Sequence, residues 1–271
     1  MSSELVSVIM GVYYHRDTLE LLKRAVESIL KQTYQNIEFL ICDNGSTSAA
    51  MQCLEQYAMN DQRIKLVRDV SNTDLASKLN ACLRDAKGTY IARMDDDDYA
   101  YSIRLERQVS FLKLHPDIDF VGSNVLLRRQ PDLEIIGKRV FPKYPVPKDF
   151  FMSQPYIHPS LMFRREALIK VCGYSERPHQ RFCEDYDLLL RMYGAQMRGA
   201  NLQTILLDYS IPATAKGSRK MAHRWNEVCT RWCRFQQLHL FPGALPYVVK
   251  PLLVGMLPEK LLKRLKRRYN E

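Results

Sequence analysis

Short apolar runs alternate with amphipathic segments along the first third of the chain, and this alternation constrains the fold more than any other feature. The first run, at residues 5–13, is almost continuously apolar, as in a strand that is buried on both faces. Three further strand-like runs follow, at 37–42, 64–67 and 89–94. The apolar residues between these runs recur at helical spacing. Strands that alternate with helices of about ten to fifteen residues indicate βαβ units. The pattern predicts an α/β fold with a mostly parallel, Rossmann-like central sheet flanked by helices.

Acidic residues stand where two of these strands end. Asp43 follows the second run, and the four aspartates Asp95–Asp98 follow the fourth. Right-handed crossovers bring the carboxyl ends of parallel strands to one edge of the sheet, where ligands bind in open α/β folds. Four adjacent carboxylates repel one another unless water or a cation neutralises them. An acidic loop in water is one interpretation, and a cation site facing the same crevice as Asp43 is the other.

The remainder of the chain carries weaker signals of the same kinds. Helices are predicted at 104–114, which Pro116 stops, and from Glu184, because acidic residues suit the first turn of a helix. Further segments are predicted as a loop or hairpin at 128–150 and as strands at 120–127, at 158–165 (leading into a short helix) and at 203–207.

Positive charge is concentrated at the carboxyl end of the chain. Residues 209–271 hold thirteen Lys or Arg and three Asp or Glu, so their net charge of +10 equals that of the whole protein. We therefore divide the chain into an α/β domain at 1–208 and a basic helical extension at 209–271. Within the extension, 259–269 predicts a basic amphipathic helix of the kind that lies on an anionic membrane surface. A solvated tail and a protein-docking helix are the alternatives.

The cysteines and the hydropathy of the chain indicate its cellular compartment. The seven cysteines are odd in number, form no CxxC pair and follow no secretory leader, which favours reduced thiols in the cytosol. They also lack the ligand spacing of a zinc site. No uninterrupted run of about 18 apolar residues predicts a transmembrane helix. We therefore expect a cytoplasmic protein.

Four motifs, in family order and with suitable gaps, resemble those of the family 2 glycosyltransferases, inverting nucleotide-sugar-dependent enzymes with a GT-A fold. The motifs lie within residues 5–210 and are Ser7–Tyr13, similar to the first strand and nucleotide loop; Asp43–Thr47, similar to an Asp-Asp-Gly-Ser turn; Gly88–Asp98 with Arg104-Leu105 downstream, similar to the DxD region; and Glu184–Leu188, similar to the Glu-Asp motif. The resemblance implies a GT-A fold for residues 1–208.

The resemblance implies a nucleotide site at the ends of the first two strands. Asp43 is similar to the residue that accepts a hydrogen bond from the base, and Tyr13, beside Val12, is placed to stack on that base. A core role is the alternative for this tyrosine. Asn44 stands where the family has a second aspartate, so a charge is lost there. Asp95 and Asp96 complete the implied nucleotide contacts.

The same resemblance implies a Mn²⁺ or Mg²⁺ ion at the acidic run. Asp95 and Asp97 correspond to the DxD pair, with Asp97 in direct contact with the metal, while Asp96 and Asp98 contact ribose, water or a loop donor. Both cations prefer carboxylate oxygens and keep waters and substrate phosphates as their other ligands. Such an ion makes a nucleoside diphosphate a better leaving group.

On the acceptor side the resemblance implies Asp185 as the general base, with Glu184 beside it. In an inverting displacement, this base removes the proton of the acceptor hydroxyl. An ordinary acidic helix N-terminus is the alternative. His158 and Arg164 are assigned to the acceptor or the diphosphate, with a structural histidine and a solvent-facing arginine as the alternatives.

These motifs predict an enzyme that adds one sugar, from a UDP-sugar or else a dTDP- or GDP-sugar, to an acceptor hydroxyl. The acceptor that the resemblance implies is a lipid-linked glycan of capsule, O-antigen or lipopolysaccharide, at the inner face of the cell membrane. Met221 replaces the Gln of the QxxRW motif of processive synthases, which favours single addition.

Proteins of other classes are the competing hypotheses. A nucleic-acid-binding protein is suggested by the basic charge, but the four aspartates would repel phosphates. A pyrophosphorylase would need a Gly-rich loop, and only Gly11 lies near the first strand. A relative that binds sugar nucleotides without transferase activity is the third alternative.

Overall fold

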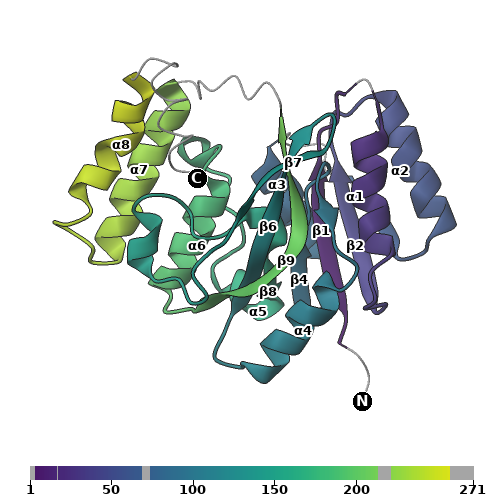
Figure 1. The fold of residues 1–271 in the computed structure, drawn as a ribbon, viewed down its shortest axis with the longest axis horizontal. Helices are drawn as coiled ribbons and strands as arrows, with labels where there is room; N and C mark the ends of the chain where they lie inside the picture. Colours follow the sequence, from purple (N-terminus) through teal and green to yellow (C-terminus); the bar gives the residue numbers. More distant parts are fainter. Residues whose placement is uncertain (1–3, 17, 69–73, 213–220, 257–271) are drawn as a thin grey trace.

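A nine-stranded sheet forms the centre of the computed structural model, which describes residues 4–16, 18–68, 74–212 and 221–256 (Figure 1). The strand order is β3-β2-β1-β4-β8-β6-β9-β5, and β7 pairs with β6 off this path. The strands are β1 (Val6–Val12), β2 (Ile37–Asp43), β3 (Ile64–Val67), β4 (Tyr90–Arg93), β5 (Tyr99–Ala100), β6 (Phe120–Gln130), β7 (Glu134–Arg139), β8 (Met162–Arg164) and β9 (Gly199–Pro212).

Six of the nine strands in the described residues run in one direction, which confirms the predicted mostly parallel sheet. β1 pairs in parallel with β2 and β4, β2 with β3, and β6 with β9, whereas β5, β7 and β8 run antiparallel to their neighbours. The segment predicted as a loop or hairpin at 128–150 contains the β6–β7 turn. The strand predicted at 203–207 lies within β9, which is longer than predicted at both ends.

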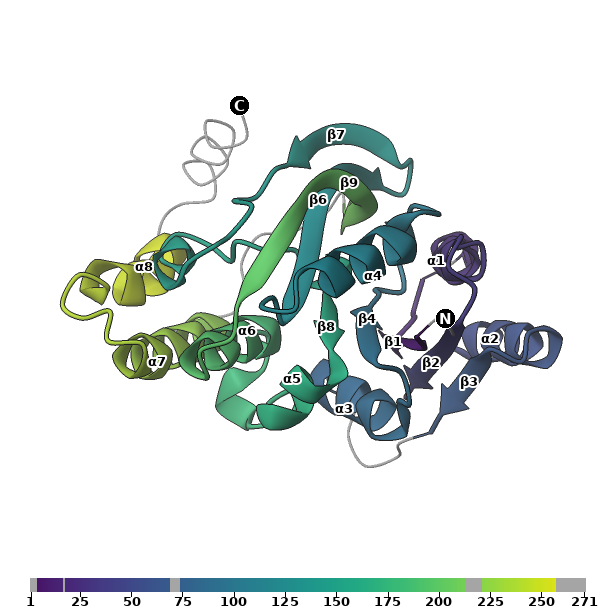
Figure 2. The ribbon, with the colours of Figure 1, turned by 90° about the horizontal axis from the view of Figure 1, so that it is seen from below.

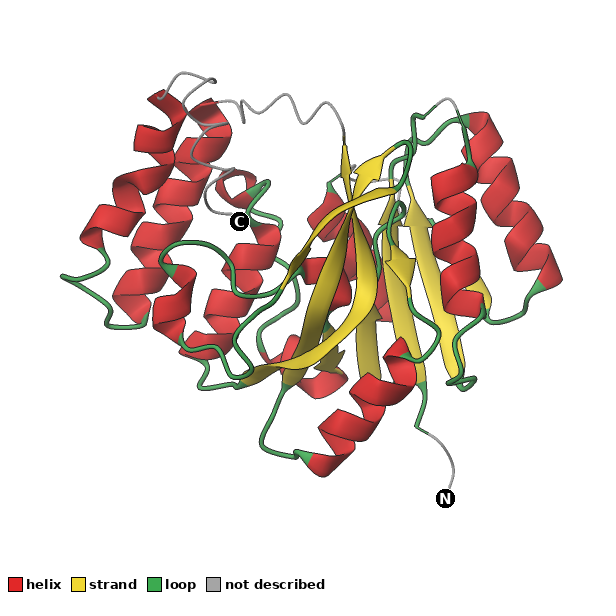
Figure 3. Cartoon of the chain, in the orientation of Figure 1, coloured by secondary structure: helices red, strands yellow, loops and turns green. Residues whose placement is uncertain are grey.

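Helices cover both faces of the sheet (Figures 2 and 3). One hydrophobic cluster contains residues of α1, α2 and α4, and a second contains residues of α3, α5 and α6. β1 contributes side chains to both clusters. Val8 and Met10 belong to the first cluster and Ile9 belongs to the second, because successive side chains of a strand point to opposite faces. The helices are α1 (Glu20–Leu30), α2 (Ser48–Asn60), α3 (Leu75–Asp85), α4 (Arg104–Leu114), α5 (Arg165–Lys170), α6 (Glu184–Gly194), α7 (Met221–Gln237) and α8 (Leu245–Met256).

The described part of the C-terminal region, α7 and α8, packs against α6. Phe235 of α7 is fully buried in the second cluster. Arg234 Nε lies 2.7 Å from the buried Asp187 carboxylate of α6. The boundary expected after residue 208 falls inside β9, and the division into two domains stays a prediction. The helix predicted at 259–269 lies outside the described residues.

Several cations of the basic extension take part in this packing. Arg224 donates to the Pro251 carbonyl at 3.0 Å, and Arg231 is 3.0 Å from Glu227. Together with Arg234, these side chains show that part of the excess charge has internal partners. Within the described ranges, no helix is both long enough and apolar enough to cross a bilayer.

Candidate active site

The first half of the site lies where β1 and β2 end side by side. Their parallel register pairs Val12 with Asp43. The Tyr13 ring that follows β1 is 61% exposed, which argues against a core role for it. Gly45, at φ +94°, lets the turn after β2 approach this ring, since a Cβ on Gly45 would lie 3.3 Å from Tyr13 Cε2. An exposed aromatic ring and a carboxylate are therefore held next to each other.

A buried lysine supports this corner. Lys78 of α3 is 2% exposed, its Nζ donates to the Val12 carbonyl at 2.7 Å, and the same Nζ lies 5.0 Å from the centre of the Tyr13 ring. Burial lowers the pKa of Lys78, while the charges of Asp43 and Asp96 act in the opposite direction. Lys78 thus orients both the main chain and the ring at the end of β1.

Asp95–Asp98 form the turn between β4 and β5, at the same edge of the sheet. The Asp97 carboxylate accepts hydrogen bonds from Arg16 at 2.7 Å and from Gln130 at 2.8 Å. Asp95 forms an ion pair with the fully buried Arg93 guanidinium. The acidic run is therefore tied to the body of the protein, unlike a loop that is simply solvated.

Burial and mutual repulsion raise the pKa values of carboxyl groups in this run. Burial, followed by the charges of Asp97 and Asp95, raises the pKa of Asp96 to about 7, and burial and Asp95 also raise the pKa of Asp97. A divalent cation would reverse this effect. No three Asp, Glu, His or Cys side chains of the described residues converge into a metal cage. A pair of carboxylates, with phosphates and water as the remaining ligands, is a donor set of the kind that Mn²⁺ and Mg²⁺ accept.

Asp98 differs from its neighbours because it is completely buried. Its Oδ1 accepts a hydrogen bond from the Ser210 amide at 2.8 Å, and the Ser210 hydroxyl donates to the Asp97 carbonyl at 2.6 Å. Burial and the charges of Asp95 and Asp97 raise the pKa of Asp98 well above its usual value. The donor that the structure shows for Asp98 is thus a main-chain amide of strand β9, whereas ribose, water or a loop donor was expected.

The second half of the site is the N-terminus of α6. Asp185 Oδ1 accepts from the Tyr186 amide at 2.7 Å, and Asp185 Oδ2 accepts from Gln154 at 3.2 Å. Asp185 and Glu184 line a cavity of about 360 Å³ that Asp95 also lines. Acidic residues far apart in the sequence thus share one cavity.

We expect Glu184 to make stability depend on pH. Burial and the neighbouring Asp185 charge raise the pKa of Glu184 from 4.5 to about 7. A folded state with the higher carboxyl pKa holds its proton more tightly, so the unfolding free energy falls as pH rises between these two values. Relative to Glu184→Gln, the unmodified protein should lose roughly 3–6 °C in Tm between pH 5 and pH 8. Thermal unfolding of both proteins across this range tests it, and a constant Tm difference would contradict it.

His158 is a buried wall residue of the same cavity. Its Nε2 shares a 2.8 Å hydrogen bond with the Tyr174 hydroxyl. Burial, and then the charge of Arg93, lowers the pKa of His158 well below its usual value. The ring is therefore neutral at physiological pH, which suits an acceptor hydroxyl better than a phosphate.

The structure contradicts the expected role of Arg164 on the diphosphate or the acceptor. Arg164 pairs with Tyr90 at the start of β4, whereas Asp95 follows the end of that strand. Its guanidinium donates to the carbonyls of Leu112, at 2.6 Å, and Ile118, at 2.9 Å. Arg164 therefore satisfies carbonyl groups at and beyond the C-terminal end of α4 and is not near the carboxylates.

Sequence reasoning missed several residues that surround the expected ones. Arg93 carried a signal, since a charged residue is unusual in a short strand that is buried throughout. Gln154 lies outside every predicted element, and Tyr209, which lines the same cavity, lies beyond the expected domain boundary. Arg16 and Gln130 carried no signal, because only the fold brings them to Asp97.

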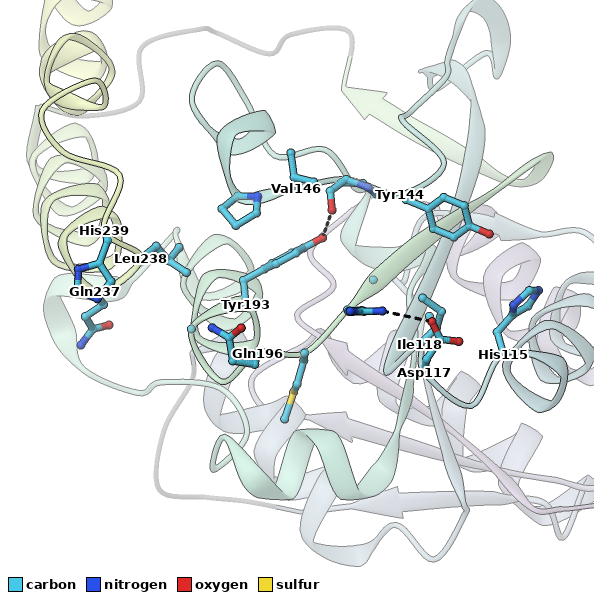
Figure 4. A pocket seen from close by; sticks show the side chains of 16 residues that line it. His115, Asp117, Ile118, Tyr144, Val146, Tyr193, Gln196, Gln237, Leu238 and His239 are labelled. Atoms are coloured by element: carbon cyan, nitrogen blue, oxygen red, sulfur yellow. Dashed lines mark hydrogen bonds and ion pairs between the residues drawn. The ribbon is translucent and has the colours of Figure 1, made fainter.

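A second cavity, of about 590 Å³, opens at the opposite edge of the sheet (Figure 4). Its walls include Ile118 and Gly199, next to the starts of β6 and β9, and Tyr193, whose hydroxyl donates to the Pro145 carbonyl at 2.7 Å. None of its lining residues belongs to the expected site. The candidate active site is therefore the smaller, carboxylate-lined cavity.

Known proteins with similar sequences and folds identify the family. Residues 7–172 match the family described as Glycosyl transferase family 2. The chain is 34% identical over 264 residues to the putative glycosyltransferase EpsE of Bacillus subtilis, covering 97% of this chain and 93% of that protein. It is 37% identical over 134 residues to the Escherichia coli protein named UDP-Glc:alpha-D-GlcNAc-diphosphoundecaprenol beta-1,3-glucosyltransferase WfaP, covering 49% and 50% of the two chains.

A solved structure agrees with this match at the level of the fold. The mannosyltransferase PcManGT of Pyrobaculum calidifontis, in complex with GDP-Man and Mn²⁺, superimposes with a TM-score of 0.63 at 19% identity, covering 97% of this chain and 79% of that one. The chain therefore belongs to glycosyltransferase family 2 and has its GT-A fold.

Proposed function

We propose that the protein is an inverting glycosyltransferase that moves one sugar from a UDP-sugar to a hydroxyl group of a lipid-linked glycan in surface polysaccharide biosynthesis. The observation that carries this proposal is the cavity in which Glu184 and Asp185 face the same space as Asp95. A single displacement needs a base and a leaving-group site within reach of one bound sugar. The alternative of a binding protein without transferase activity would not require the pair on α6.

The nucleotide is assigned to the corner formed by Val12, Tyr13 and Asp43. The exposed Tyr13 ring offers a surface for base stacking, and the Asp43 carboxylate beside it can accept a hydrogen bond from a base N–H. Asp96 accepts a hydrogen bond from the Tyr13 main chain, which connects this corner to the acidic turn. The name of WfaP gives UDP-Glc as its donor, which supports a UDP-sugar here.

A Mn²⁺ or Mg²⁺ ion is assigned to Asp95 and Asp97. Their part-exposed carboxylates and the mutual repulsion within the turn support this donor set. When bound, the ion supplies neutralising charge for the departing diphosphate. The structure of PcManGT contains GDP-Man and Mn²⁺, which supports the use of a divalent cation here. Asp98, tied to β9, keeps the turn in place.

Asp185 is the proposed general base. Two N–H donors, from Tyr186 and Gln154, fix the orientation of its carboxylate. Asp185 removes the proton of the acceptor hydroxyl while that oxygen bonds to the anomeric carbon and the bond from this carbon to the diphosphate breaks on the opposite face. The raised pKa of Glu184 leaves part of it protonated at neutral pH and therefore unavailable to accept a proton.

The enzyme is proposed to work in the cytoplasm, on the inner face of the cell membrane. The name of WfaP specifies an acceptor on diphosphoundecaprenol, which is a lipid carrier. The net charge of +10 on residues 209–271 suits an anionic membrane surface.

A panel of UDP-, GDP- and dTDP-sugars, each with and without Mn²⁺, tests the function. We expect one UDP-sugar with Mn²⁺ to raise Tm by roughly 3–8 °C. The same donor should release UDP when an undecaprenyl-diphosphate-linked glycan is added. A thermal shift without UDP release from any acceptor would favour the binding-only alternative. The absence of any shift across the panel would overturn the proposal.

A further inference from the structure

The outer side of the α7–α8 hairpin carries an unusual amount of exposed apolar surface. We define the hairpin face by six side chains, which are between 41% and 76% exposed: Trp225, Trp232, Leu245, Val249, Leu253 and Met256. These include both tryptophans of the chain. Large contiguous apolar surfaces are uncommon on soluble proteins and mark interaction sites.

The two helices present these side chains on the same side. On α8, Leu245, Val249 and Leu253 follow one another at intervals of four, which places them on one stripe. Residues two apart lie on nearly opposite sides of a helix. Tyr247, two residues before Val249, stacks on Phe151 of the protein body with ring centres 4.8 Å apart.

The same argument holds for α7. Arg234, two residues after Trp232, pairs with Asp187 of α6. Trp225 lies seven residues before Trp232 and therefore on its stripe. Both stripes point away from the body, and Figures 1 and 2 show the hairpin at the edge of the molecule, remote from β1–β3.

The sequence that continues from α8 indicates what this face contacts. Residues 260–268 follow the hairpin closely and contain six Lys or Arg and no acidic residue. A second copy of the chain would bring the same positive charge to the contact and would be repelled. An anionic bilayer attracts it, and each basic residue near such a surface strengthens binding by roughly fivefold. Tryptophan side chains favour the boundary between lipid and water.

We propose that the hairpin face lies in the surface of an anionic bilayer, with its tryptophans at the lipid boundary. This inference rests on the proposed function for its purpose, which is to hold the active site beside a lipid-linked acceptor. Figure 1 shows the C-terminal end of α8 on the upper side of the molecule, the side toward which β1 and β2 point. The C-terminal end of the hairpin face and the carboxylate-lined edge of the sheet therefore lie at the same end of the molecule (Figure 1).

The experiment compares the full chain with two double variants. Trp225→Ser with Leu253→Ser removes apolar area from the hairpin face. Met59→Ser with Leu114→Ser is the matched control, because Met59 and Leu114 are 82% and 77% exposed but lie on α2 and α4. Binding is measured by co-sedimentation with vesicles of phosphatidylcholine and phosphatidylglycerol, and with vesicles of phosphatidylcholine alone.

We expect the face variant to bind the anionic vesicles at least roughly tenfold more weakly than the unmodified protein, since one buried leucine alone contributes about that factor. The control variant should bind as the unmodified protein does, and vesicles of phosphatidylcholine alone should bind poorly. Equal binding by the face variant would overturn the proposal, because the basic residues alone would then account for attachment.

Tryptophan emission supplies the second measurement, since both tryptophans lie on the hairpin face. In the unmodified protein, emission should shift to shorter wavelength on anionic vesicles and be quenched by brominated lipids. Emission that is already shielded from acrylamide without lipid would overturn the proposal in favour of cover by residues 257–271 or by a second copy. The face variant should keep its nucleotide thermal shift and its transfer to a short-chain soluble acceptor, so failure of the proposed function is distinguishable from failure to bind lipid.

Discussion

Asp185→Asn is expected to lower the rate of sugar transfer by about 10²–10⁴-fold, the range by which a positioned general base contributes. The asparagine keeps the shape of the side chain and can still accept from the Tyr186 amide, but it cannot take the proton of the acceptor hydroxyl. Donor binding should be unchanged because the nucleotide is assigned to Tyr13 and Asp43, at the other half of the site. Transfer assays and the nucleotide thermal shift, measured on the same preparations, test both expectations.

Asp187→Asn, two residues further along α6, is the control for a structural effect. The Asp187 carboxylate is fully buried and pairs with Arg191 at 2.8 Å and with Arg234 at 2.7 Å. Its replacement should lower the unfolding free energy by about 3 kcal/mol, because two largely buried arginine side chains lose their common charged partner. Folded Asp187→Asn should retain most of its transfer activity. Normal turnover by Asp185→Asn would show that another group accepts the proton.

The parallel half of the fold was predictable because its signals are local. Each apolar run from β1 to β4 is followed or preceded by its own helix, and the predicted run at 5–13 contains the observed β1 at Val6–Val12. The antiparallel insertion of β8 between β4 and β6 was not predictable. Residues of β8 contact strands that lie about 40–70 positions earlier in the chain, and a three-residue strand carries too little pattern to specify those partners.

The site was predictable to the extent that strand ends and family motifs specify it. Asp43 and Asp95 were expected at one edge because parallel strands end there, and the register of β1 with β2 and β4 has that arrangement. Arg164 was misplaced because its motif position does not reveal strand direction. β8 runs opposite to β4, so this arginine lies at the far end of the sheet. The hydrogen-bond partners of the carboxylates, such as Gln154, are set by tertiary packing alone.

Asp97→Asn is expected to remove the Mn²⁺-dependent part of the nucleotide thermal shift and to weaken Mn²⁺ binding by at least about 100-fold. Substitutions of groups that merely support a metal ligand cost about 10–100-fold in affinity, so the loss of a direct ligand should cost more. Asparagine retains one acceptor oxygen but no charge, and charge is what draws a divalent cation to this turn. Titration with Mn²⁺ in the presence of UDP, followed by calorimetry, measures this change.

The ligand-free stability of Asp97→Asn distinguishes loss of the metal from a damaged fold. The variant loses the pair with Arg16, whose side chain is 37% exposed, and such exposed pairs contribute only about 0–1 kcal/mol. It also removes one of the charges that repel Asp96, which offsets that loss. The Tm without nucleotide or metal should therefore change by no more than about 3 °C. Asp132→Asn, which alters an exposed pair with Arg129, should change neither Tm nor Mn²⁺ binding. Retention of the full Mn²⁺-dependent shift by Asp97→Asn would move the metal to Asp95 and other groups of the turn.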